Sequence, residues 1–170
     1  KRLISIRCLP IRSLAMGLLC AALSPLALAQ TFVLDDSTSP KSRVVPKSAI
    51  DEQGRPLNKS LEPDRAILRF GEVMYRLDMR PHLGQQARVY FVRAPETGPA
   101  TGTRLNWSTR SGNLQGSLLG GDRALIWSGK VTEPWMSLGI QLDLDFDLQR
   151  WLPSVKLGNT EHATYFELER

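Results

Sequence analysis

Apolar and polar residues alternate without a break from Leu138 to Leu148. The even positions carry Leu, Ile or Phe, and the odd positions carry Gly, Gln or Asp. A period of two over this length predicts a β-strand with one buried and one solvated face, since a helix would distribute the leucines around its axis. We therefore expect Leu144 and Phe146 in a hydrophobic core and the aspartates on the opposite face.

Shorter segments with the same alternation follow one another from Arg65 onward. Turn sequences separate them, among them Ser111-Gly112-Asn113 and Gly120-Gly121-Asp122, and no segment has the spacing of a long amphipathic helix. The alternation changes phase across Gly71, which predicts a β-bulge there. Residues 65–170 are therefore predicted to form an all-β domain, an antiparallel β-sandwich of immunoglobulin-like size with about seven to eight strands, or else a small barrel.

Residues 30–64 differ in composition from the segments that follow. They contain four prolines, several Ser and Lys residues, and only two short apolar patches, Phe32-Val33-Leu34 and Val44-Val45. So little apolar surface does not offset the entropy lost when a chain becomes ordered. This stretch is therefore expected to be a flexible N-terminal arm, whose apolar patches can add a strand to another subunit.

Residues 1–29 have the features of a removable export signal. A basic start precedes the apolar stretch from Leu14 to Leu23, and Ala27-Leu28-Ala29 has the small residues of a cleavage site. The apolar stretch is too short to span a membrane as a helix. We expect cleavage after Ala29 and export. The competing interpretation, a lipoprotein acylated at Cys20, is weakened by the bulky Leu19 before it.

Removal of this segment would lower the net charge of the chain. It carries four of the 22 basic residues and none of the 17 acidic ones, so the net charge falls from +5 to about +1. A strongly basic chain would have suggested nucleic acid or an anionic membrane as a partner, and we now expect neither. Both cysteines, Cys8 and Cys20, also lie here. The remaining domain is expected to be held by its hydrophobic core alone.

The sequence contains no motif that points to catalysis or to a cofactor. It lacks Gly-x-Ser-x-Gly, and after residue 29 it has no cysteine that could act as a nucleophile. Its two histidines, His82 and His162, are too few for a zinc site without cysteines, and His82 is expected to be a solvated turn residue. We therefore predict a protein that is not an enzyme and carries no cofactor.

Asp143, Asp145 and Asp147 are weak candidates for a metal site. Residues on one strand face are about 7 Å apart, so at most two of them could share a calcium ion that needs about six to eight oxygens. The alternative is a solvated acidic face paired with arginines of a neighbouring strand, such as Arg76 or Arg88.

The four tryptophans fall into two groups. Trp107 and Trp127 are in phase with strand leucines and are expected in the core. Trp135 follows Pro134, and Trp151 lies two residues before Pro153. These two are the better candidates for exposed contacts. An exposed indole offers a flat surface for a sugar ring or a protein partner.

The chain runs from an export signal through an arm to a sandwich, with Trp127-Ser128-Gly129 before a late strand and Tyr165-Phe166 near the C-terminus. This layout resembles that of fimbrial and pilus-associated subunits of Gram-negative bacteria. The resemblance implies export to the periplasm or cell surface and joining of subunits by strand addition. Phe32, Val33 and Leu34 are then the expected partner contacts.

The leading hypothesis is therefore a structural or assembly subunit of a surface appendage or envelope complex. The alternative is a carbohydrate- or ligand-binding module of the envelope, with Trp135 and Trp151 as its glycan contacts. An envelope enzyme ranks third, because no set of catalytic residues rises above chance.

Overall fold

Nine strands and two short 3-10 helices make up the regular structure of the part of the chain described here. The structure is a computed structural model, and it describes residues 29–40, 46–96, 102–149 and 164–170. The strands are β1 (Thr31–Val33), β2 (Ser48–Ile50), β3 (Arg65–Asp78), β4 (Gln86–Arg93), β5 (Arg104–Thr109), β6 (Gln115–Leu118), β7 (Arg123–Lys130), β8 (Trp135–Asp147) and β9 (Thr164–Glu169). The helices are η1 (Leu57–Lys59) and η2 (Arg80–His82).

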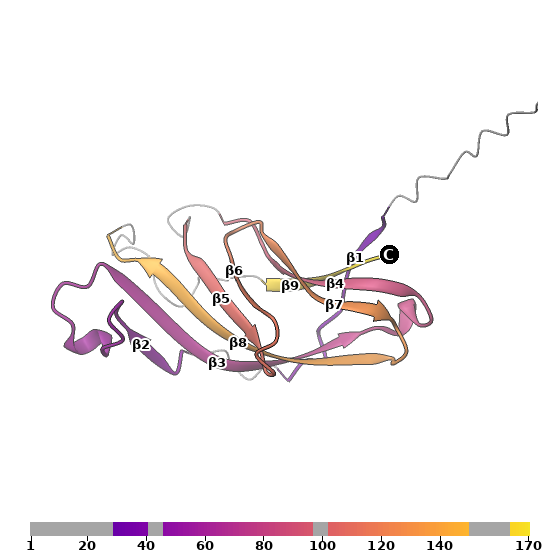
Figure 1. The fold of residues 1–170 in the computed structure, drawn as a ribbon, viewed down its shortest axis with the longest axis horizontal. Helices are drawn as coiled ribbons and strands as arrows, with labels where there is room; N and C mark the ends of the chain where they lie inside the picture. The colour runs from indigo at the N-terminus through magenta and orange to yellow at the C-terminus, as the bar shows by residue number, and fades with distance from the viewer. Residues whose placement is uncertain (1–28, 41–45, 97–101, 150–163) are drawn as a thin grey trace, which may run out of the picture.

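The strands form two antiparallel sheets. The four-stranded sheet has the order β1-β9-β4-β7, and the five-stranded sheet has the order β2-β3-β8-β5-β6 (Figure 1). The prediction of an all-β antiparallel sandwich is confirmed. The described strands are more numerous than the seven or eight expected because β1 and β2 come from the stretch that was expected to be an arm.

The pairing of β3 with β8 is the longest in the molecule and follows the predicted alternation. Every second residue of β8 from Ile140 to Phe146 is buried. The register shifts between Arg69 and Gly71, and Gly71 has a φ of +76°, a conformation that suits glycine. The predicted bulge is thus confirmed. It lets β3 keep its apolar residues inward on both sides of the phase change.

The core lies between the two sheets and is rich in aromatic rings. Phe166 of β9 lies 4.9 Å from Tyr75 and 5.3 Å from Phe91, measured between ring centroids. Trp107 meets Phe91 edge to face and is buried, as predicted. Trp127, on the edge strand β7, packs against this core but is only partly buried. The edge position explains the difference, since no strand of the described chain covers its far side.

Arg93 is a buried charged residue that the sequence did not predict. The Arg93 side chain is 1% exposed and donates hydrogen bonds of 2.9 Å to the backbone carbonyls of Thr103 and Leu118. It also forms an ion pair with Glu96. Burial lowers the pKa of Arg93, and the Glu96 carboxylate opposes that effect. The guanidinium thus ties the end of β4 to the chain entering β5 and leaving β6.

The described parts of residues 30–64 belong to the sandwich. β1 pairs with β9 and β2 pairs with β3, so this stretch adds an edge strand to each sheet. The expectation of a flexible arm is corrected on this point. Its physical reason is that exposed backbone groups on a sheet edge can order a neighbouring segment through hydrogen bonds, without an alternating apolar pattern in that segment.

Phe146→Ala should destabilise the protein far more than Asp145→Asn. Phe146 is buried in the core, and its truncation is expected to cost about 3–5 kcal/mol. The Asp145 carboxylate forms an ion pair of 2.6 Å with Arg65, which is half exposed, so its loss should cost about 1 kcal/mol or less. Urea unfolding of the two variants measures both values. A larger loss for Asp145→Asn would contradict the assigned faces of β8.

Candidate functional site

The chain from Gln30 to Leu34 forms the outer edge of the four-stranded sheet. The backbone groups of Gln30 and Arg170 exchange two hydrogen bonds of 3.1 Å, and the Leu34 amide donates to the Phe166 carbonyl at 2.9 Å. β1 pairs with β9 between these bonds. Because β1 has a partner on one side only in the described structure, its other edge offers free backbone groups for a further strand.

The three predicted contact residues of this segment have different surroundings. Leu34 is buried in the core, and Phe32 packs against that core while remaining partly exposed. Val33 is 69% exposed on the outer face. While β1 stays on β9, only Val33 is open to a partner. Phe32 and Leu34 become available only if β1 leaves its own sandwich.

After Leu34 the chain crosses from one sheet to the edge of the other. The Asp35 carbonyl accepts a hydrogen bond from the Asp78 amide at 2.9 Å. The Ser39 hydroxyl accepts another from the Arg76 amide, also at 2.9 Å. Further on, the Lys47 amide donates to the Arg69 carbonyl at 2.7 Å, where β2 begins. Residues 34–40 and 46–50 therefore lie along one edge of both sheets, on the β9 side and on the β3 side.

His82 lies beneath β1 and is buried, which corrects the expectation of a solvated turn residue. Its ring centroid is 5.2 Å from that of Phe32, whose other contacts include the Arg170 guanidinium, 4.6 Å from the ring centroid. Its Nδ1 has no hydrogen-bond partner within the described ranges. Burial and the charge of Arg170 lower the pKa of His82, and the Asp78 carboxylate partly opposes them. A turn residue became buried because β1 packs over it.

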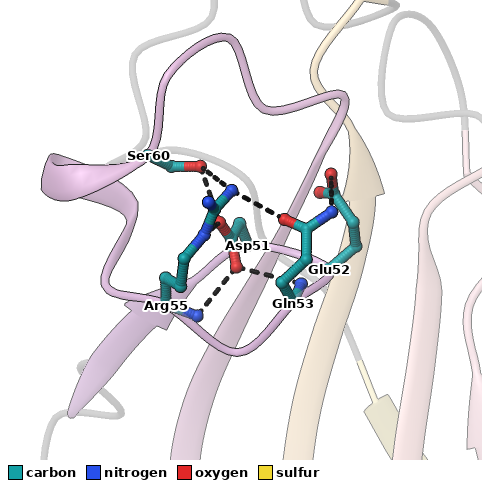
Figure 2. A network of polar contacts seen from close by, with 5 residues as sticks. All are labelled: Asp51, Glu52, Gln53, Arg55 and Ser60. Atoms are coloured by element: carbon teal, nitrogen blue, oxygen red, sulfur yellow. Dashed lines mark hydrogen bonds and ion pairs between the residues drawn. The ribbon is translucent and has the colours of Figure 1, made fainter.

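Asp51 organises the loop between β2 and β3 (Figure 2). Its carboxylate is fully buried and accepts hydrogen bonds from the Ser60 hydroxyl at 2.6 Å, the Arg55 Nε at 2.7 Å and the backbone amides of Gln53 and Arg55. Burial alone would raise the pKa of Asp51. The hydrogen bonds from Ser60 and Arg55 outweigh that effect and hold the pKa at about 2. This network gives the loop a defined shape next to the edge strand β2.

Trp135 is half covered rather than open. The guanidinium carbons of Arg76 and Arg80 lie 4.5 and 4.8 Å from the centroid of its ring, and Arg80 is held by an ion pair of 2.6 Å with Asp78. These cation–π contacts occupy the surface that a sugar ring would need. Trp151, the other predicted glycan contact, lies outside the described residues. A shared glycan site of the two tryptophans therefore stays a prediction.

The aspartates of β8 pair with arginines of β3. Asp145 binds Arg65, and the Oδ2 of Asp143 is 3.8 Å from the Nε of Arg69. The suggested partners Arg76 and Arg88 are used elsewhere, since Arg76 covers Trp135 and Arg88 pairs with Glu169. Asp143, Asp145 and Asp147 face outward at alternate positions of β8, and no three His, Cys, Asp or Glu side chains of the described chain could hold a metal ion together.

A polar hollow of about 720 Å³ lies on the outer face of the five-stranded sheet and was not foreseen. Side chains of β3, β8, β5 and β6 line it. In the sequence, the only trace of this hollow is the polar residues at alternate positions of 104–109 and 115–118. Sequence alone could not show that these segments are neighbours of β8.

Asp51→Asn should lower the thermal midpoint near neutral pH, and the deficit should shrink in acid. In the folded protein the Asp51 pKa is about 2, below its ordinary value of 3.8. The stabilisation is therefore complete above the ordinary value and is lost as the pH falls through about 2. Thermal unfolding of wild type and variant from neutral to strongly acidic pH measures the difference. Glu133→Gln, at an exposed position outside the network, is the control, and a deficit independent of pH would contradict this account.

Mild acid should loosen β1 in the wild type but not in His82→Phe. The folded-state pKa of His82 is lowered, so docking of β1 is strongest above the ordinary value of 6.5 and weakens as the pH falls below it. His82→Phe keeps a ring against Phe32 and removes the titration. Hydrogen exchange of the amides of residues 30–34, corrected for intrinsic rates and compared between about pH 7 and pH 5, measures the effect. Equal loss of protection in both proteins would disprove the role of His82.

No family model, no curated protein and no solved structure matches this chain. Among the described residues, no helix is long and apolar enough to cross a membrane. The function must therefore be inferred from the geometry of the chain itself, and β1 with its pairing to β9 is the strongest candidate for a functional element.

Proposed function

We propose that this chain is a non-enzymatic assembly subunit, exported to the periplasm or surface of a Gram-negative cell, that joins other protein subunits by β-strand addition. The exchanged element is β1 with its flanking residues Gln30 and Leu34. The placement of β1 supports this proposal. It is a three-residue strand at the edge of its sheet, joined to β9 by backbone hydrogen bonds and anchored by two apolar side chains.

Departure of β1 would leave β9 with an unpaired edge and the core with a gap. The backbone groups that β1 satisfies would be exposed, and so would the space filled by Leu34 and part of Phe32. The β1 of another subunit of the same sequence fits both, because it offers the same backbone bonds and the same side chains. Exchange between identical chains therefore preserves every local contact.

Opening of β1 would leave the other strand pairings in place. β9 lies between β1 and β4, whereas β1 has one neighbour, so its release leaves the remaining pairings of the described sandwich intact. Short edge segments with few buried side chains open at a lower free-energy cost than core strands. The chain after Leu34 stays attached to β3 through the Asp35 carbonyl and the Ser39 hydroxyl, so the movement would be confined to residues 30–34.

A disulfide trap tests the exchange directly. Because Gln30 and Leu34 bond across to Arg170 and Phe166, the intervening pair Val33–Glu167 is a non-hydrogen-bonded pair, whose close Cα atoms suit a disulfide. We would place Val33→Cys and Glu167→Cys in the full chain, with Cys8 and Cys20 replaced by serine. Oxidation of a concentrated sample after incubation should give disulfide-linked oligomers on a non-reducing gel.

The matched control is Arg76→Cys with Ser137→Cys. This pair is also non-hydrogen-bonded, because the Arg76 amide points away from β8 toward Ser39, and it joins two strands that do not exchange. It should give only intramolecular disulfides at every concentration. If Val33→Cys with Glu167→Cys behaves in the same way, β1 remains within its own chain and the proposal is wrong.

A further inference from the structure

We propose that the polar hollow on the five-stranded sheet is a binding site for a neutral saccharide. This inference is independent of strand exchange, because the hollow lies over β3, β8, β5 and β6 whereas β1 belongs to the other sheet.

Strand register arranges the polar side chains of the hollow in two parallel rows. In the first row, Asp143 of β8 lies between Arg69 of β3 and Asn106 of β5, and Ser117 of β6 follows. In the second row, Gln141, Ser108 and Gln115 are neighbours in the same strand order. Strand spacing makes the first row about 14 Å long, and the rows are about 7 Å apart. This is an ordered grid of polar groups on four strands.

The chemistry of the grid matches a ligand rich in hydroxyl groups. Asn106, Gln115 and Gln141 each carry an amide with donors and an acceptor, and Ser108 and Ser117 add hydroxyls that do both. A sugar hydroxyl also donates and accepts, so each can pair with such groups in either direction. Arg69 and Asp143 carry opposite charges, which leaves the hollow without the net charge that would select an anion or a cation.

These groups are not engaged with one another. Within the described residues, the amides and hydroxyls of the grid make no side-chain hydrogen bond, and Asp143 has only its 3.8 Å contact with Arg69. Farther along the same face, Arg65 and Asp145 are joined by two hydrogen bonds. Burial raises the pKa of Asp143, and Arg69 partly opposes this shift. The grid thus holds polar groups that are open to solvent and that a ligand can engage without breaking a side-chain hydrogen bond of the protein.

The test is titration of the full chain with neutral oligosaccharides by isothermal calorimetry. Cellopentaose, maltopentaose and the pentamer of N-acetylglucosamine serve as probes. At least one of them should bind, and Asn106→Ala with Gln141→Ala should weaken that binding about tenfold or more, since the two changes remove one amide from each row. Circular dichroism and the thermal midpoint confirm that the variant is folded.

The control is Gln86→Ala with Ser128→Ala, which removes two exposed polar side chains from the other sheet. It should bind as the wild type does. The proposal is overturned if none of the probes binds or if the Asn106 and Gln141 variant binds unchanged. It is also overturned if a sulfated oligosaccharide binds more tightly than every neutral probe and loses that advantage in salt, because the site would then select charge.

Discussion

The antiparallel pairing of β3 with β8 is the interaction on which the rest of the structure depends. It runs from Arg65 opposite Asp147 to Asp78 opposite Trp135, so it extends along the full length of both strands. Its inner face supplies Tyr75, Leu144 and Phe146 to the core, against which the aromatic residues of β4 and β9 pack. Its outer face supplies the arginine–aspartate pairs and three lining residues of the polar hollow, Arg69, Gln141 and Asp143. A domain without a disulfide in its described part needs such a continuous ladder to hold its two layers in place.

The N-terminal part of the chain covers one edge of each sheet. Protein sheets with open edges risk pairing with other chains, and the proposed function makes one of the covering segments, β1, the element that is exchanged. β1 covers β9, whereas Ser39, Lys47 and β2 cover parts of β3. In assembly by exchange, the β1–β9 pairing that covers the edge of the monomer would also join two subunits. The outer face of the five-stranded sheet would stay free for a ligand.

Local pattern was sufficient to predict the strands after residue 64, but it predicted neither β1 and β2 nor which strands are neighbours. The alternation of β8, the bulge at Gly71 and the turns around Gly112 and Gly121 are local, and the structure confirms them. The buried Arg93, the buried His82 and the pairing of β1 depend on which distant segments pack together, and no local pattern records that. The same holds for the hollow, whose rows exist only once β5 and β6 lie beside β8.

The bulge at Gly71 also limits how the gene for this domain can change. β3 has 14 residues against 13 in β8, and the additional residue is accommodated at this one point. Deleting Phe70, the residue without a partner, would keep Arg69 opposite Asp143 and Gly71 opposite Leu142, so the pairing would become regular and both halves would keep their faces. Deleting Ile67 instead would direct Arg65 or Arg69 into the apolar layer. A codon can therefore be lost from β3 only at the bulge without turning a charged side chain inward, so strand length here should vary far less than the length of the turns.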